Sequence, residues 1–283
     1  MRKVKYFFIS FLPLIITEVT VNALAILAVL ILFICSISSS SGDFNSCISR
    51  FYDIVTSDDY NALIMICYTL IILPSFSIFY YLKLGGNIKP NFKKTFNIPL
   101  FLGIIFLVPA GYMMSDYICI GIQILKPTWW QSYLDLLETT GLGSNTLIMS
   151  IYGIIFAPIC EELIFRGLTL RLAKISLPFW GANLLQAALF GFFHGNWTQG
   201  VYAFALGLLL GYVCDKGGSL YCSILLHMLF NTWGTFMPDL ASLVTDQILY
   251  YVISLLTLTF FALIGFSLFN KGLEEKKKVK NLS

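Results

Sequence analysis

The residues of this sequence that could perform chemistry lie in three short apolar stretches. The first, residues 157–166, reads APICEELIFR and holds two carboxylates and a guanidinium. The second ends at His194, and the third contains His227 and Asn231. A carboxylate can take a proton from water, while imidazole and amide groups can hold that water or an oxyanion. If these groups met in one cavity, they would form a hydrolytic site.

Helical spacing assigns different roles to the two adjacent glutamates. Glu162 and Arg166 are four residues apart, so they share a helix face and can pair, which predicts a supporting role. Glu161 points elsewhere and has no partner at helical spacing, which suits a general base. Pro158 leaves the carbonyl of Ile154 without its usual helical hydrogen bond. We therefore expect a bent backbone beside Glu161.

The two histidines leave the metal question open. His227 and Asn231 are four residues apart and can address one point. Glu161, His194 and His227 could supply three zinc ligands with an open fourth position, as in catalytic zinc sites. The chain has no His-Glu-x-x-His motif, and these donors come from three separate segments. A site without tightly bound metal is the favoured interpretation, and zinc is the alternative.

Membrane-spanning helices must position these residues. The 283-residue chain is 58% hydrophobic and 12% charged, whereas soluble domains carry about 25% charged residues. A span needs about 20 apolar residues. We expect eight spans, at residues 7–35, 60–82, 97–124, 146–166, 179–195, 199–214, 219–237 and 248–269. The prediction is an all-α, polytopic integral membrane protein with one domain, residues 1–283, in the lipid bilayer. No basic patch interleaved with aromatics indicates nucleic-acid binding.

The loops between these spans alternate in charge. Basic residues are concentrated at the N-terminus, in loop 83–96 (Lys83, Lys89, Lys93, Lys94), in residues 166–174 and in the tail 271–280. Loops 36–59 and 125–145 are acidic, and the turn 195–199 is uncharged. By the positive-inside rule, both termini are cytoplasmic. These span edges place Glu161 near the cytoplasmic face but His194 about 22 Å along its helix, a mismatch in depth.

Together, the three stretches resemble the ordered motifs of the CPBP intramembrane proteases, also called the type II CAAX prenyl endopeptidase or ABI family. The matching residues are Glu161-Glu162-x-x-x-Arg166, Phe190-x-x-x-His194 and His227-x-x-x-Asn231. The resemblance covers about residues 146–237. It implies a site in a cavity open to one side of the membrane, where Glu161 and His194 activate water. By the same analogy, His227 and Asn231 hold the substrate carbonyl or its oxyanion.

The resemblance also implies an intramembrane endopeptidase, of glutamate type or metalloprotease type. Its eukaryotic members cleave prenylated CAAX proteins, whereas bacterial members resemble proteases of bacteriocin self-immunity, peptide maturation or signalling. A composition rich in Ile, Phe, Lys and Asn is typical of an AT-rich bacterial genome. It favours a bacterial plasma membrane and a peptide or membrane-protein substrate.

Three alternatives remain open. The chain could cleave prenylated CAAX proteins, or it could be a non-catalytic immunity protein. It could also be a transporter that uses Glu161, Glu162 and Asp116 as proton relays. Transporters usually show internal repeats, and none stands out in this sequence.

Overall fold

The protein is all-helical in the part that the computed structural model describes, which comprises residues 2–39, 44–85, 95–139, 147–236 and 246–282. No strand occurs among these residues, as predicted. The helices before the polar stretches are α1 Arg2–Ile9, α2 Leu12–Ser39, α3 Phe44–Val55, α4 Asp58–Leu84, α6 Ile98–Leu125 and α7 Pro127–Thr139. An interrupted helix follows, made of α8 Leu147–Ile151, η1 Tyr152–Phe156, α9 Ala157–Glu162, η2 Leu163–Thr169 and α10 Leu170–Lys174. The last helices are α11 Phe179–Phe193, α12 Trp197–Gly217, α13 Leu220–Phe236 and α15 Gln247–Leu282.

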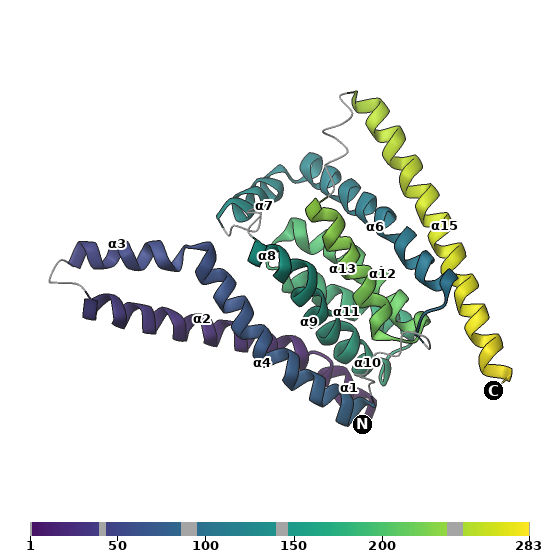
Figure 1. Cartoon of the computed structure of the whole chain (residues 1–283), viewed down its shortest axis with the longest axis horizontal. Coiled ribbons are helices and arrows are strands. Elements are labelled where there is room, and N and C mark those ends of the chain that lie inside the picture. Colours follow the sequence, from purple (N-terminus) through teal and green to yellow (C-terminus); the bar gives the residue numbers. More distant parts are fainter. Residues whose placement is uncertain (1, 40–43, 86–94, 140–146, 237–245, 283) are drawn as a thin grey trace.

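The helices that carry the polar stretches lie at the centre of the molecule (Figure 1). The interrupted helix packs against α13, and α11 packs along α12. On one side α6 and α15 lie against each other along much of their lengths, and α6 also contacts α12 and α13. On the other side α2 and α4, joined through α3, extend away as an arm (Figure 1). The candidate residues are therefore enclosed by helices on both sides.

Five of the described helical stretches are long and apolar enough to cross a membrane, against the eight that the sequence predicts. They are Lys3–Ile37, Leu63–Leu84, Ile98–Leu125, Trp197–Gly217 and Gln247–Val279. The apolar helix α11 is shorter, with 15 residues, and α13 has 17. The predicted span 146–166 is part of the interrupted helix, which contains no single regular helix of that length. An integral membrane protein is supported, but a count of eight is not confirmed.

Some predicted segments differ from the structure in their helices. The span expected at 7–35 lies within the candidate crossing Lys3–Ile37, but a short break separates α1 from α2, where Pro13 cannot donate a backbone hydrogen bond to Ile9. The acidic loops 36–59 and 125–145 contain helices α3 and α7, and α7 begins with Pro127 at its favoured first position. Lys89, Lys93 and Lys94 of the predicted basic loop lie outside the described residues.

Glycines permit several close helix contacts, and two of them illustrate the packing. A Cβ atom at Gly103 of α6 would lie 2.5 Å from the backbone nitrogen of Phe269 in α15. A Cβ atom at Gly211 of α12 would lie 1.8 Å from the Asn183 side-chain oxygen of α11. The first contact is with backbone atoms, so α6 and α15 require glycine at this point, whereas the second would force the Asn183 side chain to move.

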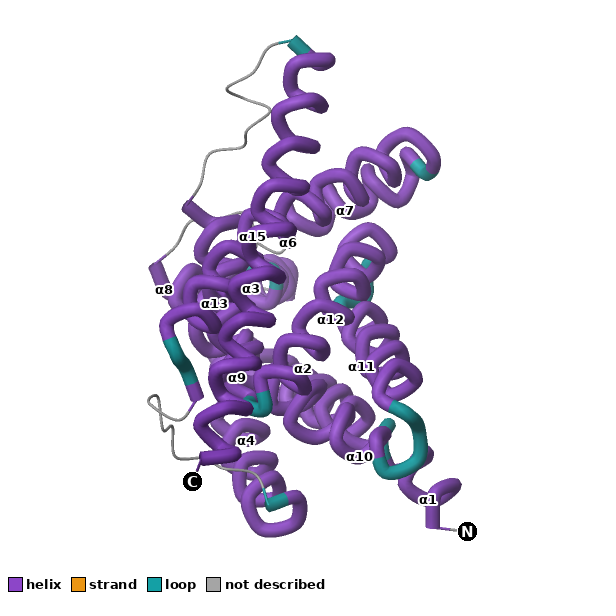
Figure 2. Tube along the Cα trace, turned by 90° about the vertical axis from the view of Figure 1, so that its right-hand side faces the viewer, coloured by secondary structure: helices purple, strands orange, loops and turns teal. Residues whose placement is uncertain are grey.

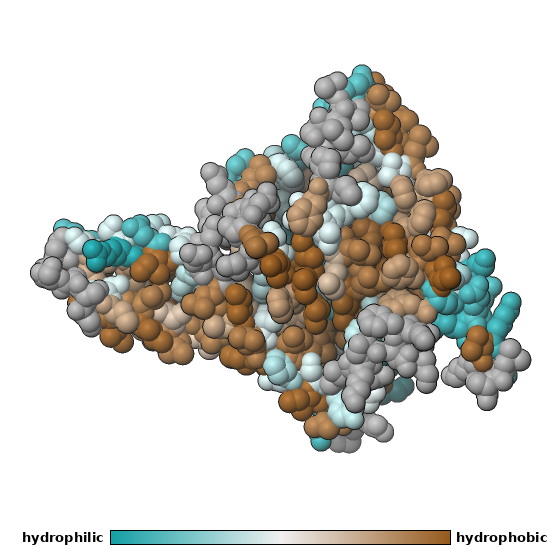
Figure 3. Space-filling view, in the orientation of Figure 1, coloured by the Kyte–Doolittle hydropathy of each residue, from teal (hydrophilic) through white to brown (hydrophobic). Residues whose placement is uncertain are grey.

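Apolar side chains cover much of the outer face of the arm, and hydrophilic residues gather at the C-terminal end of α15 (Figure 3). Exposed large hydrophobic residues occur along α2, α4 and α15. Broad apolar surfaces of this kind are expected where helices face lipid.

Candidate active site

The first polar stretch lies in a helix whose hydrogen-bond register changes twice. In η1 the N–H of Ala157 donates to the carbonyl of Tyr152, five residues earlier. In η2 the N–H of Leu170 donates to the carbonyl of Phe165, again five residues earlier. Such π turns are rare and are often found at functional sites. The sequence predicted a bent backbone beside Glu161, and in the structure π turns interrupt the helix on both sides of α9.

Asn231 completes the hydrogen bonding of the first π turn. In this register the carbonyl of Gly153 would accept from residue 158, but Pro158 has no N–H. The Asn231 side-chain Nδ2 instead donates to the Gly153 carbonyl at 2.7 Å. The sequence predicted Asn231 to address the substrate. One of its two N–H groups is already used to hold the helix that carries Glu161, which leaves the other for a substrate.

Glu162 and Arg166 form the predicted pair, and both side chains are fully buried. Arg166 Nη1 donates to Glu162 Oε1 at 2.8 Å. Arg166 Nη2 donates to the backbone carbonyl of Gly207 in α12 at 3.3 Å. The guanidinium also lies over the ring of Phe190, 4.3 Å from its centroid. This pair therefore joins the interrupted helix to α11 and α12.

The same carboxylate fixes the tautomer of His227. His227 Nδ1 lies 2.9 Å from Glu162 Oε1. Because an ionised carboxylate only accepts hydrogen bonds, Nδ1 must carry the proton and donate. In neutral His227 the other nitrogen, Nε2, is then an acceptor, and it becomes a donor only when the ring is protonated.

Nε2 of His227 faces Glu161. It lies 3.7 Å from Glu161 Oε2, too far for a direct hydrogen bond but close enough for both atoms to contact one water molecule. The Glu161 side chain is 15% exposed, whereas that of Glu162 is 0% exposed. The two adjacent glutamates thus differ as the sequence predicted, since only Glu161 has room for a reacting group.

His194 joins this group through an aromatic ring. It caps the C-terminal end of α11, and its Nδ1 donates to the carbonyl of Phe190 at 2.8 Å, so its Nε2 is an acceptor. The ring of Phe190 contacts the rings of both His194 and His227 edge-on, with centroids 4.8 and 5.9 Å apart. The structure therefore gathers Glu161, Glu162, Arg166 and His227 directly and places His194 beyond Phe190.

The predicted difference in depth between Glu161 and His194 is removed by the position at which the interrupted helix ends. The predicted span ended at residue 166, but the interrupted helix continues to Lys174. Glu161 therefore lies near the middle of residues 147–174, not close to one face. It can meet residues near the end of α11.

Sequence reasoning missed the buried polar side chains that support Arg166. Gln186 of α11 donates to the Gly207 carbonyl at 2.9 Å and to the Asn183 side chain at 2.8 Å. Asn183 in turn donates to the carbonyl of Leu208 at 3.0 Å. The signal was present, because two buried amides three residues apart in an apolar helix need partners.

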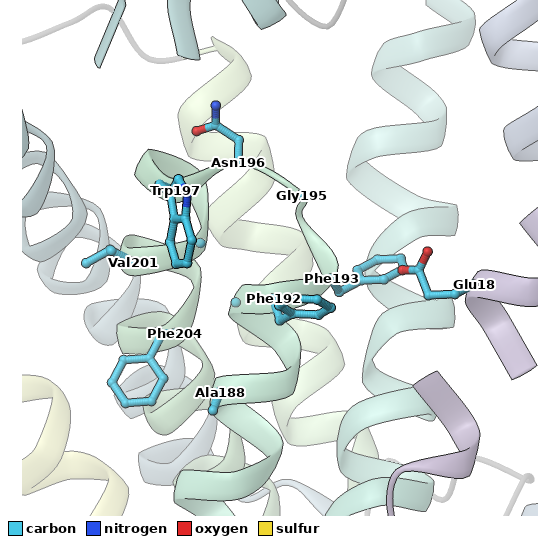
Figure 4. A pocket seen from close by; sticks show the side chains of 11 residues that line it. Glu18, Ala188, Phe192, Phe193, Gly195, Asn196, Trp197, Val201 and Phe204 are labelled. Carbon is cyan, nitrogen blue, oxygen red and sulfur yellow. The ribbon is translucent and has the colours of Figure 1, made fainter. Parts of the chain in front are cut away.

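Two hollows adjoin the site. One, of about 450 Å³, is lined by Gly153 and Asn231 together with residues of α6, α7 and α12. The other is a groove of about 580 Å³ at the end of α11, next to His194. Figure 4 shows its aromatic walls, Phe192, Phe193, Trp197 and Phe204, with Glu18 projecting from α2 toward them. The first hollow has the more polar lining, and the second is mainly apolar.

The predicted zinc ligands do not form a three-ligand cluster. Among the described residues, no group of three His, Cys, Asp or Glu side chains is placed to hold a metal ion. Glu161 and His227 face each other, and the tautomer that Glu162 sets leaves the Nε2 lone pair of His227 on the side of Glu161. Zinc binding stays a prediction, and the reaction proposed below uses the side chains alone.

A family comparison covers these same residues. Residues 143–233 match the family model described as type II CAAX prenyl endopeptidase Rce1-like. This part of the chain resembles the CPBP family. The match contains all six predicted site residues and nearly coincides with the predicted CPBP core of 146–237.

The CPBP match spans about a third of the chain and includes the interrupted helix, α11, α12 and most of α13. The flanking helices α2, α4, α6 and α15 lie outside it. A search of curated proteins and a search of solved structures each found no match. The CPBP family implies a protease. Its mechanism has to be inferred from the residues of this chain.

Proposed function

We propose that the protein is an intramembrane endopeptidase that hydrolyses a peptide bond with Glu161, His194, His227 and Asn231. The observation that carries this proposal is the orientation of His227. Its Nδ1 is held by the buried Glu162–Arg166 pair, and its Nε2 faces Glu161 at 3.7 Å. This arrangement presents a carboxylate and an imidazole to one reacting molecule, as general acid–base chemistry requires.

The proposed reaction begins with a water molecule held by Glu161 and by the acceptor nitrogen of His194. Glu161 takes a proton as the water oxygen attacks the substrate carbonyl carbon. The oxyanion that forms is stabilised by the second N–H of Asn231 and by Nε2–H of His227, whose ring enters the reaction protonated and keeps that proton throughout. The intermediate collapses as the C–N bond breaks, and the proton on Glu161 passes to the departing amine.

The membrane topology is part of the proposal. The three predicted crossings that are not long regular helices are the interrupted helix, α11 and α13. All three contribute to the core of the molecule, where protein replaces lipid, so irregular or short helices are tolerated there. We propose eight crossings in a bacterial plasma membrane, with both termini in the cytoplasm. A role in peptide maturation, signalling or bacteriocin immunity would fit this location.

The apolar groove beside His194 favours one second candidate function. A groove of about 580 Å³ with aromatic walls could hold the lipid chain of a prenylated peptide. This matches the CAAX prenyl endopeptidase description of the family. Comparing a prenylated peptide with its unprenylated counterpart tests it. A strong preference for the prenylated form would favour this candidate over cleavage of unmodified peptides.

Cleavage in ¹⁸O-labelled water tests the proposed reaction. The purified protein would be incubated with a peptide library, and the products analysed by mass spectrometry. Hydrolysis predicts one ¹⁸O atom in each new C-terminal carboxylate, and the Glu161→Gln variant should yield no cleavage products. Cleavage that persists in this variant would contradict the proposal.

A further inference from the structure

The polar cavity beside the site has the size and lining of a binding cleft. Its volume is about 450 Å³, within the range of about 300–1,000 Å³ found for ligand sites. Its lining includes Asp116, Tyr133, Gln199, Tyr202, Asn231 and Thr235. Because Asn231 and Gly153 belong both to this lining and to the candidate site, the cavity adjoins the site at Asn231.

The walls of this cavity suit a polypeptide more than a lipid chain. They offer hydroxyl, amide and carboxylate groups, which can satisfy the N–H and C=O groups of an extended peptide. Helix α7 closes one side, where the Tyr133 and Tyr202 hydroxyls are 3.3 Å apart and the Trp129 and Trp197 rings stack at 5.3 Å. An apolar chain placed here could form no hydrogen bonds with these groups.

The cavity lies at one end of the helix bundle. Its lining comes from the later half of α6, from α7, from the first turns of α12 and from the last turns of α13. Figures 1 and 2 place α7 at the end of the molecule opposite to both termini. Helix α12 has 21 residues, so its other end lies about 30 Å away, close to the thickness of the hydrocarbon layer.

Hydrogen bonds and an ion pair join the basic segments at that other end. Lys276 donates to the carbonyls of Thr95 and Gly217 at 2.9 and 2.8 Å. Arg171 donates to the carbonyl of Leu84 at 3.3 Å. Lys174 pairs with Asp215 at the end of α12, and the side chain of Ser176 donates to the carbonyl of Lys3. The N-terminus, α10 and the ends of α4, α12 and α15 therefore share one basic face.

The cavity end has the opposite character. On the helices that line or adjoin the cavity, it carries Asp116, Asp135 and Asp246 against Lys126. Basic residues of short loops remain on the cytoplasmic side. We propose that this cavity is the substrate cleft and that it admits an extended polypeptide segment from the extracytoplasmic face. The inference rests on the proposed protease function and adds the side of the membrane and the substrate class.

Cysteine labelling tests the side from which the cavity is open. Thr235→Cys places a thiol at the cavity, and Lys278→Cys places a matched thiol on the exposed end of α15. Spheroplasts expressing each variant would be treated with a membrane-impermeant maleimide, with the unmodified protein as the background for its native cysteines. We expect Thr235→Cys to be labelled equally before and after permeabilisation, and Lys278→Cys only afterwards. The reverse pattern would overturn the inference.

Peptide binding and cleavage separate this inference from the proposed function. An impermeant fluorogenic peptide library added to intact spheroplasts should be cleaved, and cleavage should fall when Thr235→Cys is modified by a bulky impermeant maleimide. Cleavage in detergent but not from outside spheroplasts would overturn the cleft and leave the protease. If no peptide is cleaved in either condition, the protease proposal fails. Fluorescence anisotropy of the labelled library then tests whether the cavity is a peptide-binding cleft, with the modified and the unmodified Thr235→Cys protein compared. A loss of binding on modification supports the cleft. No binding, or binding that modification leaves unchanged, overturns it.

Discussion

Removing the charge of Glu162 should destabilise the folded protein more than removing the charge of its neighbour Glu161. In Glu162→Gln the side chain keeps its shape and can still accept a hydrogen bond from His227. The Arg166 guanidinium, however, remains buried without its carboxylate partner, since both side chains are 0% exposed. The change therefore strands a charge in the centre of the molecule.

The magnitude follows from that burial. Breaking a buried ion pair by removing one partner costs about 3–5 kcal/mol. For chains of 150–250 residues, 1 kcal/mol corresponds to about 2–4 °C in Tm, so we expect a decrease on the order of 10 °C. Arg166→Met should cost a similar amount, and it also removes the contact with the Gly207 carbonyl. Removing both charges often costs little, because no buried charge is left over.

The assay is thermal unfolding of the purified variants in one detergent, together with the yield after gel filtration. Glu162→Gln and Arg166→Met should each have a Tm well below that of the wild type. The Tm of the double variant should fall by less than the sum of the two single decreases. Glu161→Gln should unfold close to the wild type, because its side chain is partly exposed and makes no direct hydrogen bond to His227. A Glu162→Gln protein as stable as the wild type would refute this account of the pair.

Two further predictions concern the elements that hold the site. Asn231→Leu should lower the free energy of unfolding by about 1–3 kcal/mol, since the Gly153 carbonyl loses its donor. Adding Pro158→Ala supplies a backbone N–H at the position that the π turn needs, so it should restore part of that stability in the same unfolding assay. Gly211→Ala should reduce the yield of folded protein, because its Cβ would lie 1.8 Å from Asn183 Oδ1. Adding Asn183→Ala should recover some of that yield, and no recovery would mean that the clash lies elsewhere.

Spacing along the chain was enough to predict the parts of the site that lie on one helix. The Glu162–Arg166 pair follows from four-residue spacing, and the structure confirms it. Pro158 indicated an irregular backbone, which takes the form of π turns. Both features depend only on residues close together in sequence. The family resemblance also depended on such short motifs, and the family match confirms it.

The features that spacing did not predict depend on contacts between helices. Nothing in the sequence pairs Asn231 with Gly153, which lies 78 residues away. The span ending predicted at residue 166 was wrong, because the continuation to Lys174 packs against other helices and so is not set by apolar length alone. Helix α7 was read as loop from its charges, although it has apolar residues that pack on α6 and α12.

The most direct test of the central claim is the specific activity of Glu161→Gln per folded molecule, measured beside that of Glu162→Gln. Both variants would be recovered by gel filtration and assayed on the peptide library that the wild type cleaves. Glu161→Gln should be folded, stable and inactive. Glu162→Gln should be recovered in low yield, with activity that falls as the folded fraction falls. A folded Glu161→Gln protein that still cleaves, beside a well-folded and inactive Glu162→Gln protein, would contradict the assignment of the two glutamates.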